Sequence, residues 1–157
     1  MKKEETIDHQ IKATWHAISR MYNQQAAKYG GTMSVGFVLL NIHSEQGAQA
    51  TKIAPQMGLE ARSLTRILKS MEEKELIYRA PDPNDKRGVF VFLTEKGQEM
   101  KNRARETVLR FNEVMRENIQ VDKLNVFFEV LQTVNGIIEK NNIYDVVHSS
   151  LAISTND

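Results

Sequence analysis

The sequence predicts a mainly α-helical fold with a small β-wing, and three observations point to it. Apolar residues recur every three or four positions through most of the chain, as in amphipathic helices. Two short helical patterns stand in the middle and are separated by a glycine. The strongest strand signal, Val89–Leu93, follows them after a turn-forming stretch. This order predicts a helix-turn-helix followed by a hairpin, with longer helices on both sides.

The first two helices are predicted from apolar residues that share one face. A helix from Thr6 to about Lys28 has one apolar stripe. The stripe consists of Ile7, Ile11, Trp15, Ile18 and Tyr22. Gly30 and Gly31 break this helix. Ser34 is then a suitable cap for a second helix, which we expect to end near residues 45–47.

Two short helices follow, at about Ala50–Met57 and Ala61–Lys74. Gly58 suits the left-handed conformation that ends the first of them. Pro55 removes a hydrogen bond inside that helix and can kink it. The apolar residues of the second helix again have helical spacing, at Leu64, Ile67, Leu68 and Met71.

A β-hairpin is predicted next. Leu76–Arg79 is short and β-prone, and Val89–Leu93 is typical of a strand. Between them, Pro, Asp and Asn residues favour a turn. Thr94 and Asp122 can then cap two further helices, the second with apolar residues at coiled-coil-like spacing.

Composition narrows the class of protein. The chain has 157 residues, of which 41% are hydrophobic and 26% charged, an ordinary globular balance. It has neither an apolar run of about 20 residues nor a signal-peptide core, so we expect a cytoplasmic protein without a membrane partner. The lack of cysteine excludes disulfides, thiolate metal sites and thiol-based sensing. A net charge of +1 decides nothing about partners, but residues 61–70 contain three bases and no acid.

The second short helix has side chains suited to DNA. In a helix-turn-helix the second helix lies in the major groove, where arginine can bond a guanine edge with two donors. The candidate contacts on its exposed side are Arg62, Ser63, Thr65, Arg66 and Lys69. An ordinary amphipathic surface helix has the same pattern, so this helix alone does not establish DNA binding.

The charged hairpin tip directly after the helix pair favours the DNA interpretation. Lys86 and Arg87 can lie on phosphate or enter the minor groove, whose negative potential attracts arginine. Asp82 and Asp85 are unexpected beside DNA, and we predict that Asp85 orients Arg87 and holds the turn closed. Taken alone, the tip is more simply a solvated turn.

Residues 58–97 resemble the core of the MarR family of winged helix-turn-helix regulators. The family pattern has a Thr-Arg pair in the recognition helix, a Leu-Ile strand start, an Asp-x-x-Asp-x-Arg wing and then Leu-Thr-x-x-Gly. The matching residues here are Thr65, Arg66, Leu76, Ile77, Asp82, Asp85, Arg87, Leu93, Thr94 and Gly97. One departure is Glu75, where the family usually has glycine; it requires a different helix end or bears backbone strain.

The resemblance implies a two-fold homodimer whose terminal helices interlock. We therefore assign residues 1–33 and 98–142 to dimerisation, residues 34–97 to DNA binding and residues 143–157 to a tail that is at most partly ordered. The apolar stripes agree with this division, but packing within one subunit explains them as well.

The resemblance also implies a small aromatic effector bound between the dimer helices and the DNA-binding lobes. Residues suited to such a space are Trp15, His16, Met33, Phe37 and His43. Core packing accounts for the apolar ones equally well. We expect no cofactor and no metal site. The sequence has no phosphate-binding glycine loop and no nucleophile elbow, so we do not expect an enzyme.

Taken together, these features predict a sequence-specific transcription regulator. It would be a ligand-responsive repressor that binds a pseudo-palindromic operator in double-stranded DNA as a homodimer. The main alternative is a winged-helix protein-interaction module that does not bind DNA, and the three bases on the second short helix argue against it. A small enzyme is the second alternative, and no catalytic constellation supports it.

Overall fold

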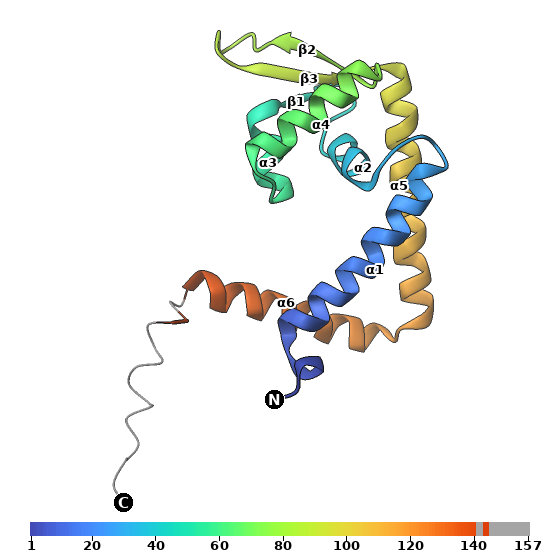
Figure 1. Cartoon of the computed structure of the whole chain (residues 1–157), viewed down its shortest axis with the longest axis vertical. Helices are drawn as coiled ribbons and strands as arrows, with labels where there is room; N and C mark the ends of the chain where they lie inside the picture. The colour runs from blue at the N-terminus through green and yellow to red at the C-terminus, as the bar shows by residue number, and fades with distance from the viewer. Residues whose placement is uncertain (141–142, 145–157) are drawn as a thin grey trace, which may run out of the picture. The chain divides into compact units, whose positions relative to one another are not determined.

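The computed structural model describes residues 1–140 and 143–144, and its fold class is the predicted one: mainly helical with a small antiparallel sheet (Figure 1). The elements in chain order are η1 (Lys3–Glu5), α1 (Ile7–Ala27), α2 (Met33–Leu40), β1 (Ala48–Gln49), α3 (Ala50–Met57), α4 (Ala61–Glu73), β2 (Ile77–Pro81), β3 (Val89–Leu93), α5 (Glu95–Asn118) and α6 (Val121–Lys140). Of the tail predicted at 143–157, all but the first two residues lie outside the described part.

The chain divides into two compact units, Met1–Arg110 and Phe111–Asp157, and α5 crosses the boundary. The division describes only which residues pack against one another. The assignment of residue ranges to dimerisation and DNA binding stays a prediction. No helix within the described residues is long and apolar enough to cross a membrane.

Helix α2 differs from the prediction at both ends. Its cap is Thr32 and not Ser34, because the Thr32 hydroxyl oxygen accepts the backbone N–H of Val35 at 3.2 Å. The helix ends at Leu40, well before the expected end at residues 45–47. The reason is a tight turn in which Nδ1 of His43 accepts two backbone N–H groups and Gly47 has a φ of 68°.

The turn leads into β1, a two-residue strand that the sequence analysis did not predict. The sheet order is β1-β3-β2, with all pairs antiparallel. Successive residues of a strand point to opposite faces, and Val91 is accordingly buried in the core. Phe90 and Phe92 lie on the other face, where Phe92 stacks on Tyr78 with ring centroids 5.4 Å apart.

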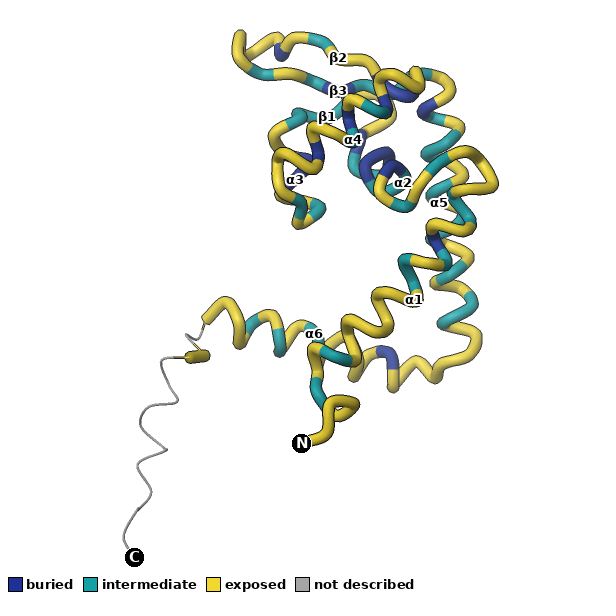
Figure 2. Tube along the Cα trace, viewed as in Figure 1, coloured by how far each residue is buried: buried dark blue, intermediate teal, exposed yellow. Residues whose placement is uncertain are grey.

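One apolar core in the first unit joins α2, α3, α4 and the sheet (Figure 2). Its largest fully buried side chains are Leu39, Ile42, Ile53, Met71, Leu76, Ile77, Val38 and Val91. Helix α3 continues through Pro55 to Met57 without ending early. The core therefore holds both short helices against the base of the hairpin.

The start of α5 is tied to the end of α4. The Thr94 hydroxyl accepts the N–H of Gly97 at 3.0 Å and donates to the carbonyl of Glu75 at 2.6 Å, which confirms Thr94 as a cap. The prediction for Asp122 was wrong, because α6 begins at Val121 and places Asp122 inside its first turn. A carboxylate there still interacts favourably with the helix dipole.

Glu75 carries the backbone strain that the sequence analysis allowed for. Its φ is 58°, in the left-handed region that costs a residue with a side chain about 1–2 kcal/mol. The N–H of the next residue, Leu76, donates to the carbonyl of Met71 at 2.9 Å and closes the end of α4. A glycine would make the same turn without the steric cost.

We therefore expect Glu75→Gly to raise the free energy of unfolding by about 0.5–1 kcal/mol, since relief of strain outweighs the added freedom of the unfolded chain. Urea unfolding followed by circular dichroism measures this. Glu73→Gly is the matched control: Glu73 is the last residue of α4 and is not at positive φ, so this change should destabilise by up to about 1 kcal/mol. A loss of stability in both variants would contradict strain at Glu75.

Candidate nucleic-acid interface

Helices α3 and α4 form the predicted helix-turn-helix. Gly58 ends α3 in the left-handed conformation, with a φ of 63°, and the N–H of Leu59 donates to the carbonyl of Ala54 at 2.9 Å. Leu64, Leu68 and Met71 of α4 are buried in the core. The opposite side of α4 therefore faces solvent.

All five side chains predicted to contact DNA from α4 lie on that exposed side. They are Arg62, Ser63, Thr65, Arg66 and Lys69. The Thr65 hydroxyl donates to the carbonyl of Ala61 at 2.9 Å, so in the free protein it is bonded within the helix. The three cations have no acidic residue between them from Ala61 to Ser70. This face can therefore attract phosphate and donate to base edges.

The hairpin β2–β3 extends beyond α4, and its tip exposes Asp85, Lys86 and Arg87 (Figure 1). The Asp85 carboxylate accepts the backbone N–H of Arg87 at 2.9 Å, and its carbonyl accepts the N–H of Gly88 at 2.9 Å. Asp85 thus holds the turn closed, as expected. The hydrogen bond it makes to Arg87 is to the backbone and not to the guanidinium.

Asp82 is buried, with 6% of its surface exposed, and it closes the base of the tip. Its carboxylate accepts the backbone N–H of Asn84 and the side-chain amide of Gln49, both at 2.8 Å. Both hydrogen bonds stabilise the charged carboxylate and so hold the pKa of Asp82 below its usual value. The bond from the Asn84 backbone has the larger effect and the bond from Gln49 the smaller. No pattern in the sequence points to Gln49, which lies 33 positions from Asp82.

A second link joins α4 to the hairpin. Arg79 of β2 and Glu72 of α4 form an ion pair, with Nε and Oε2 3.0 Å apart. Both side chains are partly exposed, so the pair contributes at most about 1 kcal/mol. Together with the core, it places the cationic side of α4 and the hairpin tip that carries Lys86 and Arg87 in one compact unit.

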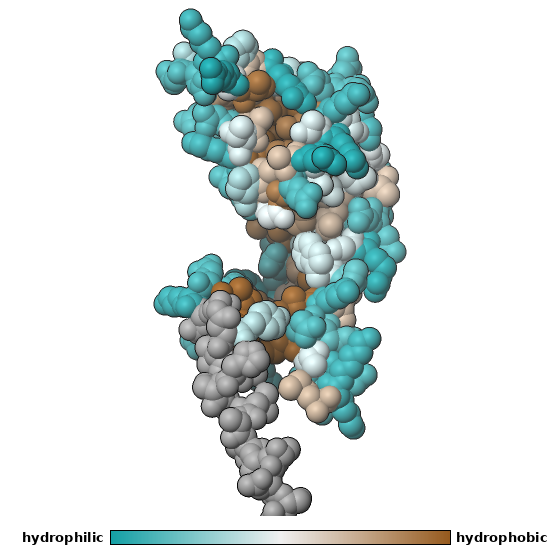
Figure 3. Space-filling model, turned by 60° about the vertical axis from the view of Figure 1, so that its left-hand side comes forward, coloured by the Kyte–Doolittle hydropathy of each residue, from teal (hydrophilic) through white to brown (hydrophobic). Residues whose placement is uncertain are grey.

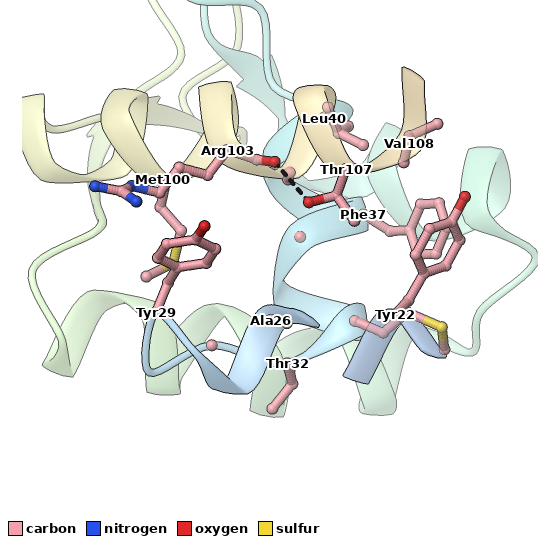
Figure 4. A pocket seen from close by; sticks show the side chains of 14 residues that line it. Tyr22, Ala26, Tyr29, Thr32, Phe37, Leu40, Met100, Arg103, Thr107 and Val108 are labelled. Carbon is pink, nitrogen blue, oxygen red and sulfur yellow. Dashed lines mark hydrogen bonds between the residues drawn. The ribbon is translucent and has the colours of Figure 1, made fainter. Parts of the chain in front are cut away.

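A small apolar pocket of about 50 Å³ lies between α1, α2 and α5 within the first unit (Figure 4). Of the five residues predicted to bind an effector, Met33 and Phe37 line it. Trp15 has its ring centroid 6.5 Å from that of Phe37 and is half-exposed, and His16 is exposed. His43 holds the turn after α2.

Most of the other side chains that line the pocket come from α1 and α5, and they were not among the predicted effector-binding residues. Tyr22 and Phe37 meet edge to face, with centroids 5.9 Å apart. At the other end, the Arg103 guanidinium lies 4.3 Å from the centre of the Tyr29 ring. Arg103 is the charged residue among those lining the pocket. No three His, Asp or Glu side chains within residues 1–140 and 143–144 are grouped to hold a metal.

Comparisons with known proteins agree with this geometry. A family model described as the MarR family matches residues 32–89, from the cap of α2 to the start of β3. The chain is similar to the transcriptional regulator TtmR of Methylorubrum extorquens, with 33% identity over 93 residues. That match covers 59% of this chain and 48% of TtmR, so it spans about half the length of the relative.

Two solved structures show the same fold at lower identity. The Staphylococcus aureus MepR–DNA complex has a TM-score of 0.77 and 18% identity, covering 83% of this chain and 97% of that chain. PcaV of Streptomyces coelicolor, in complex with its natural ligand, has a TM-score of 0.74 and 20% identity, covering 87% and 96%. These two likenesses concern the fold alone.

Proposed function

We propose that this chain is a transcription regulator of the MarR family and that it binds operator DNA through α4 and the β2–β3 wing. One observation carries the proposal: an exposed helix face with three cations and no acid lies in the same compact unit as a hairpin tip that exposes Lys86 and Arg87. Arg62, Arg66 and Lys69 would meet the major groove and its phosphates, and Arg87 would meet the minor groove.

The experiment that tests this is selection of bound sequences from a random duplex pool. We expect an enriched half-site repeated with two-fold symmetry, about one helical turn apart. Binding should weaken steeply with salt, because phosphate contacts release counterions. Failure to retain duplex at low salt would favour the alternative, a winged-helix module that binds protein.

We further propose a homodimer formed with α6. This helix exposes apolar side chains of the kind normally buried: Val126, Phe127, Phe128, Val130, Ile137 and Ile138. Brown surface beside the first grey residues in Figure 3 belongs to it. If a second copy of the chain covered these side chains, their apolar surface would be removed from water, and this would favour the dimer.

Light scattering at micromolar concentration should therefore give about twice the chain mass of 18.0 kDa. Phe127→Glu should shift the protein towards monomer or unfold it, because a charge would be buried in the interface. Asn125→Glu adds the same charge at an exposed polar position of α6. A wild-type protein that is a folded monomer would contradict the dimer.

We also propose that the protein is a repressor whose pocket senses a small aromatic molecule. The pocket is smaller than the roughly 300 Å³ typical of ligand sites, so binding would have to move α5 relative to α2. Lys101, next to the pocket residue Met100, donates to the carbonyl of Ile42 and to the Ser44 hydroxyl at the turn before the helix-turn-helix. Movement of α5 would thus reach the DNA-binding helices.

A panel of phenols and aromatic acids should contain a compound that lowers DNA affinity, with a coupling of about 1–3 kcal/mol. Ala104→Leu places a larger side chain in the pocket and should abolish the response while DNA binding persists. If no compound changes either the melting temperature of the protein or its DNA affinity, the proposal that this pocket senses a small molecule is wrong.

A further inference from the structure

The wing loop, residues 82–88 between β2 and β3, is joined to the start of the helix-turn-helix by one pair of side chains. The amide of Gln49 donates to the carboxylate of Asp82 at 2.8 Å. Gln49 is the residue before the first turn of α3, and it also pairs with Phe90 in the sheet. Its side chain therefore joins α3, β1 and the loop that carries Arg87.

Asp82 closes this loop from the other side as well. Its backbone N–H donates to the carbonyl of Gly88 at 3.0 Å, and its carboxylate accepts the N–H of Asn84. A Cβ on Gly88 would lie 2.9 Å from the Cβ of Asp82, so the two ends of the loop are in close contact. Residues 83–87 between them are all exposed, and Asp82 is the buried member of the loop.

We propose that Asp82 and Gln49 are a positioning pair that sets where Arg87 stands relative to α4. The proposal rests on the proposed function, because it assigns the pair a role in DNA binding. Asp85 shapes the turn locally, since its bonds reach no further than residue 88. The Asp82–Gln49 bond acts across 33 positions and connects the loop to the part of the protein that holds the recognition helix.

The chemistry of the pair predicts an unusual pattern among variants. Gln49→Glu brings two carboxylates together, and neither can donate a hydrogen bond. Asp82→Asn alone keeps the pair, because the Gln49 amide can turn and accept from the new side chain. Combining the two restores the pair, since an asparagine at 82 donates to a glutamate at 49 and still accepts the N–H of Asn84.

The test is affinity for selected operator duplex, measured for wild type, Q49E, D82N and the Q49E/D82N double variant. We expect Q49E to lose roughly tenfold, the scale of one good DNA contact, and D82N to stay within about threefold of wild type. The double variant should recover to within about threefold. Gln56→Glu, an equal change in charge on the exposed part of α3, is the matched control and should cost less than Q49E.

The same measurement with Arg87→Ala distinguishes positioning from general stability. If the pair acts through Arg87, Q49E should add little loss of affinity when Arg87 is already absent. Amide hydrogen exchange of residues 84–88 in the free protein should be faster in Q49E and normal in the double variant. This second readout needs no DNA.

Three outcomes would overturn the proposal. These are no recovery in the double variant, an undiminished Q49E effect in the Arg87→Ala background, and an equal loss in Q56E. If wild type binds no duplex at all, the proposed function fails instead, and the exchange data still report whether the pair orders the loop.

Discussion

Gly97→Ala should prevent this protein from folding stably. A Cβ at Gly97 would lie 1.9 Å from the carbonyl oxygen of Leu76 and 2.9 Å from its carbonyl carbon. Both are backbone atoms, so no side chain can rotate away. Leu76 is fully buried, and its carbonyl already accepts the N–H of Thr94 at 3.1 Å. Relief of the clash would have to separate α5 from the end of α4, at a cost of about 3 kcal/mol or more.

Urea or thermal unfolding followed by circular dichroism measures this effect. Gly36→Ala is the matched control, because a Cβ there would meet the Cβ of Ala104 at 3.5 Å, an ordinary contact. Gly36 lies inside α2, where alanine should stabilise by about 0.5–1 kcal/mol. Equal stability of the two variants would contradict the close approach of α5 to Leu76.

Arg66→Ala should cause the largest loss of DNA affinity among single changes that leave the fold intact. Arg66 is exposed on α4 beyond the buried stripe, so its removal disturbs no core contact. Losing one bidentate base contact costs about 1–3 kcal/mol and relaxes preference at one position of each half-site. Affinity for operator and scrambled duplex, measured over a salt series, gives both quantities.

Arg87→Ala in the same assay should behave differently. Arg87 is on the wing tip, where charge and groove width matter more than base identity, so its loss should weaken many sequences together. The salt dependence should become shallower because fewer counterions are released. Arg116→Ala, on an exposed site of α5 in the second unit, is the control.

If the Arg66→Ala and Arg87→Ala variants both bound operator with the affinity of the wild type, the proposed DNA face would be contradicted. A reversed pattern has a narrower consequence. If Arg87 sets sequence preference and Arg66 affects only the salt slope, the fold and the interface stand, and the roles of the two arginines are exchanged.

The sequence by itself determined the features that depend on residues only a few positions apart in the chain. The stripe in α4 predicts its buried side because helical periodicity brings residues three or four apart to one face. Gly58 as the end of α3 and Thr94 as the cap of α5 depend on bonds that reach only a few positions. The order of two short helices and a hairpin followed from such signals, and with it the set of exposed cations.

Features made by residues distant in the sequence were decided by the tertiary structure. Strand β1 is too short to show a period, and it exists because Ala48 and Gln49 pair with β3. The Gln49–Asp82 bond and the pocket between α1, α2 and α5 join side chains dozens of positions apart. Helix α2 stops early because His43 and Gly47 turn the chain towards that strand. Periodicity and capping report only on neighbours along the chain, so contacts that depend on how the core packs leave no comparable pattern in the sequence.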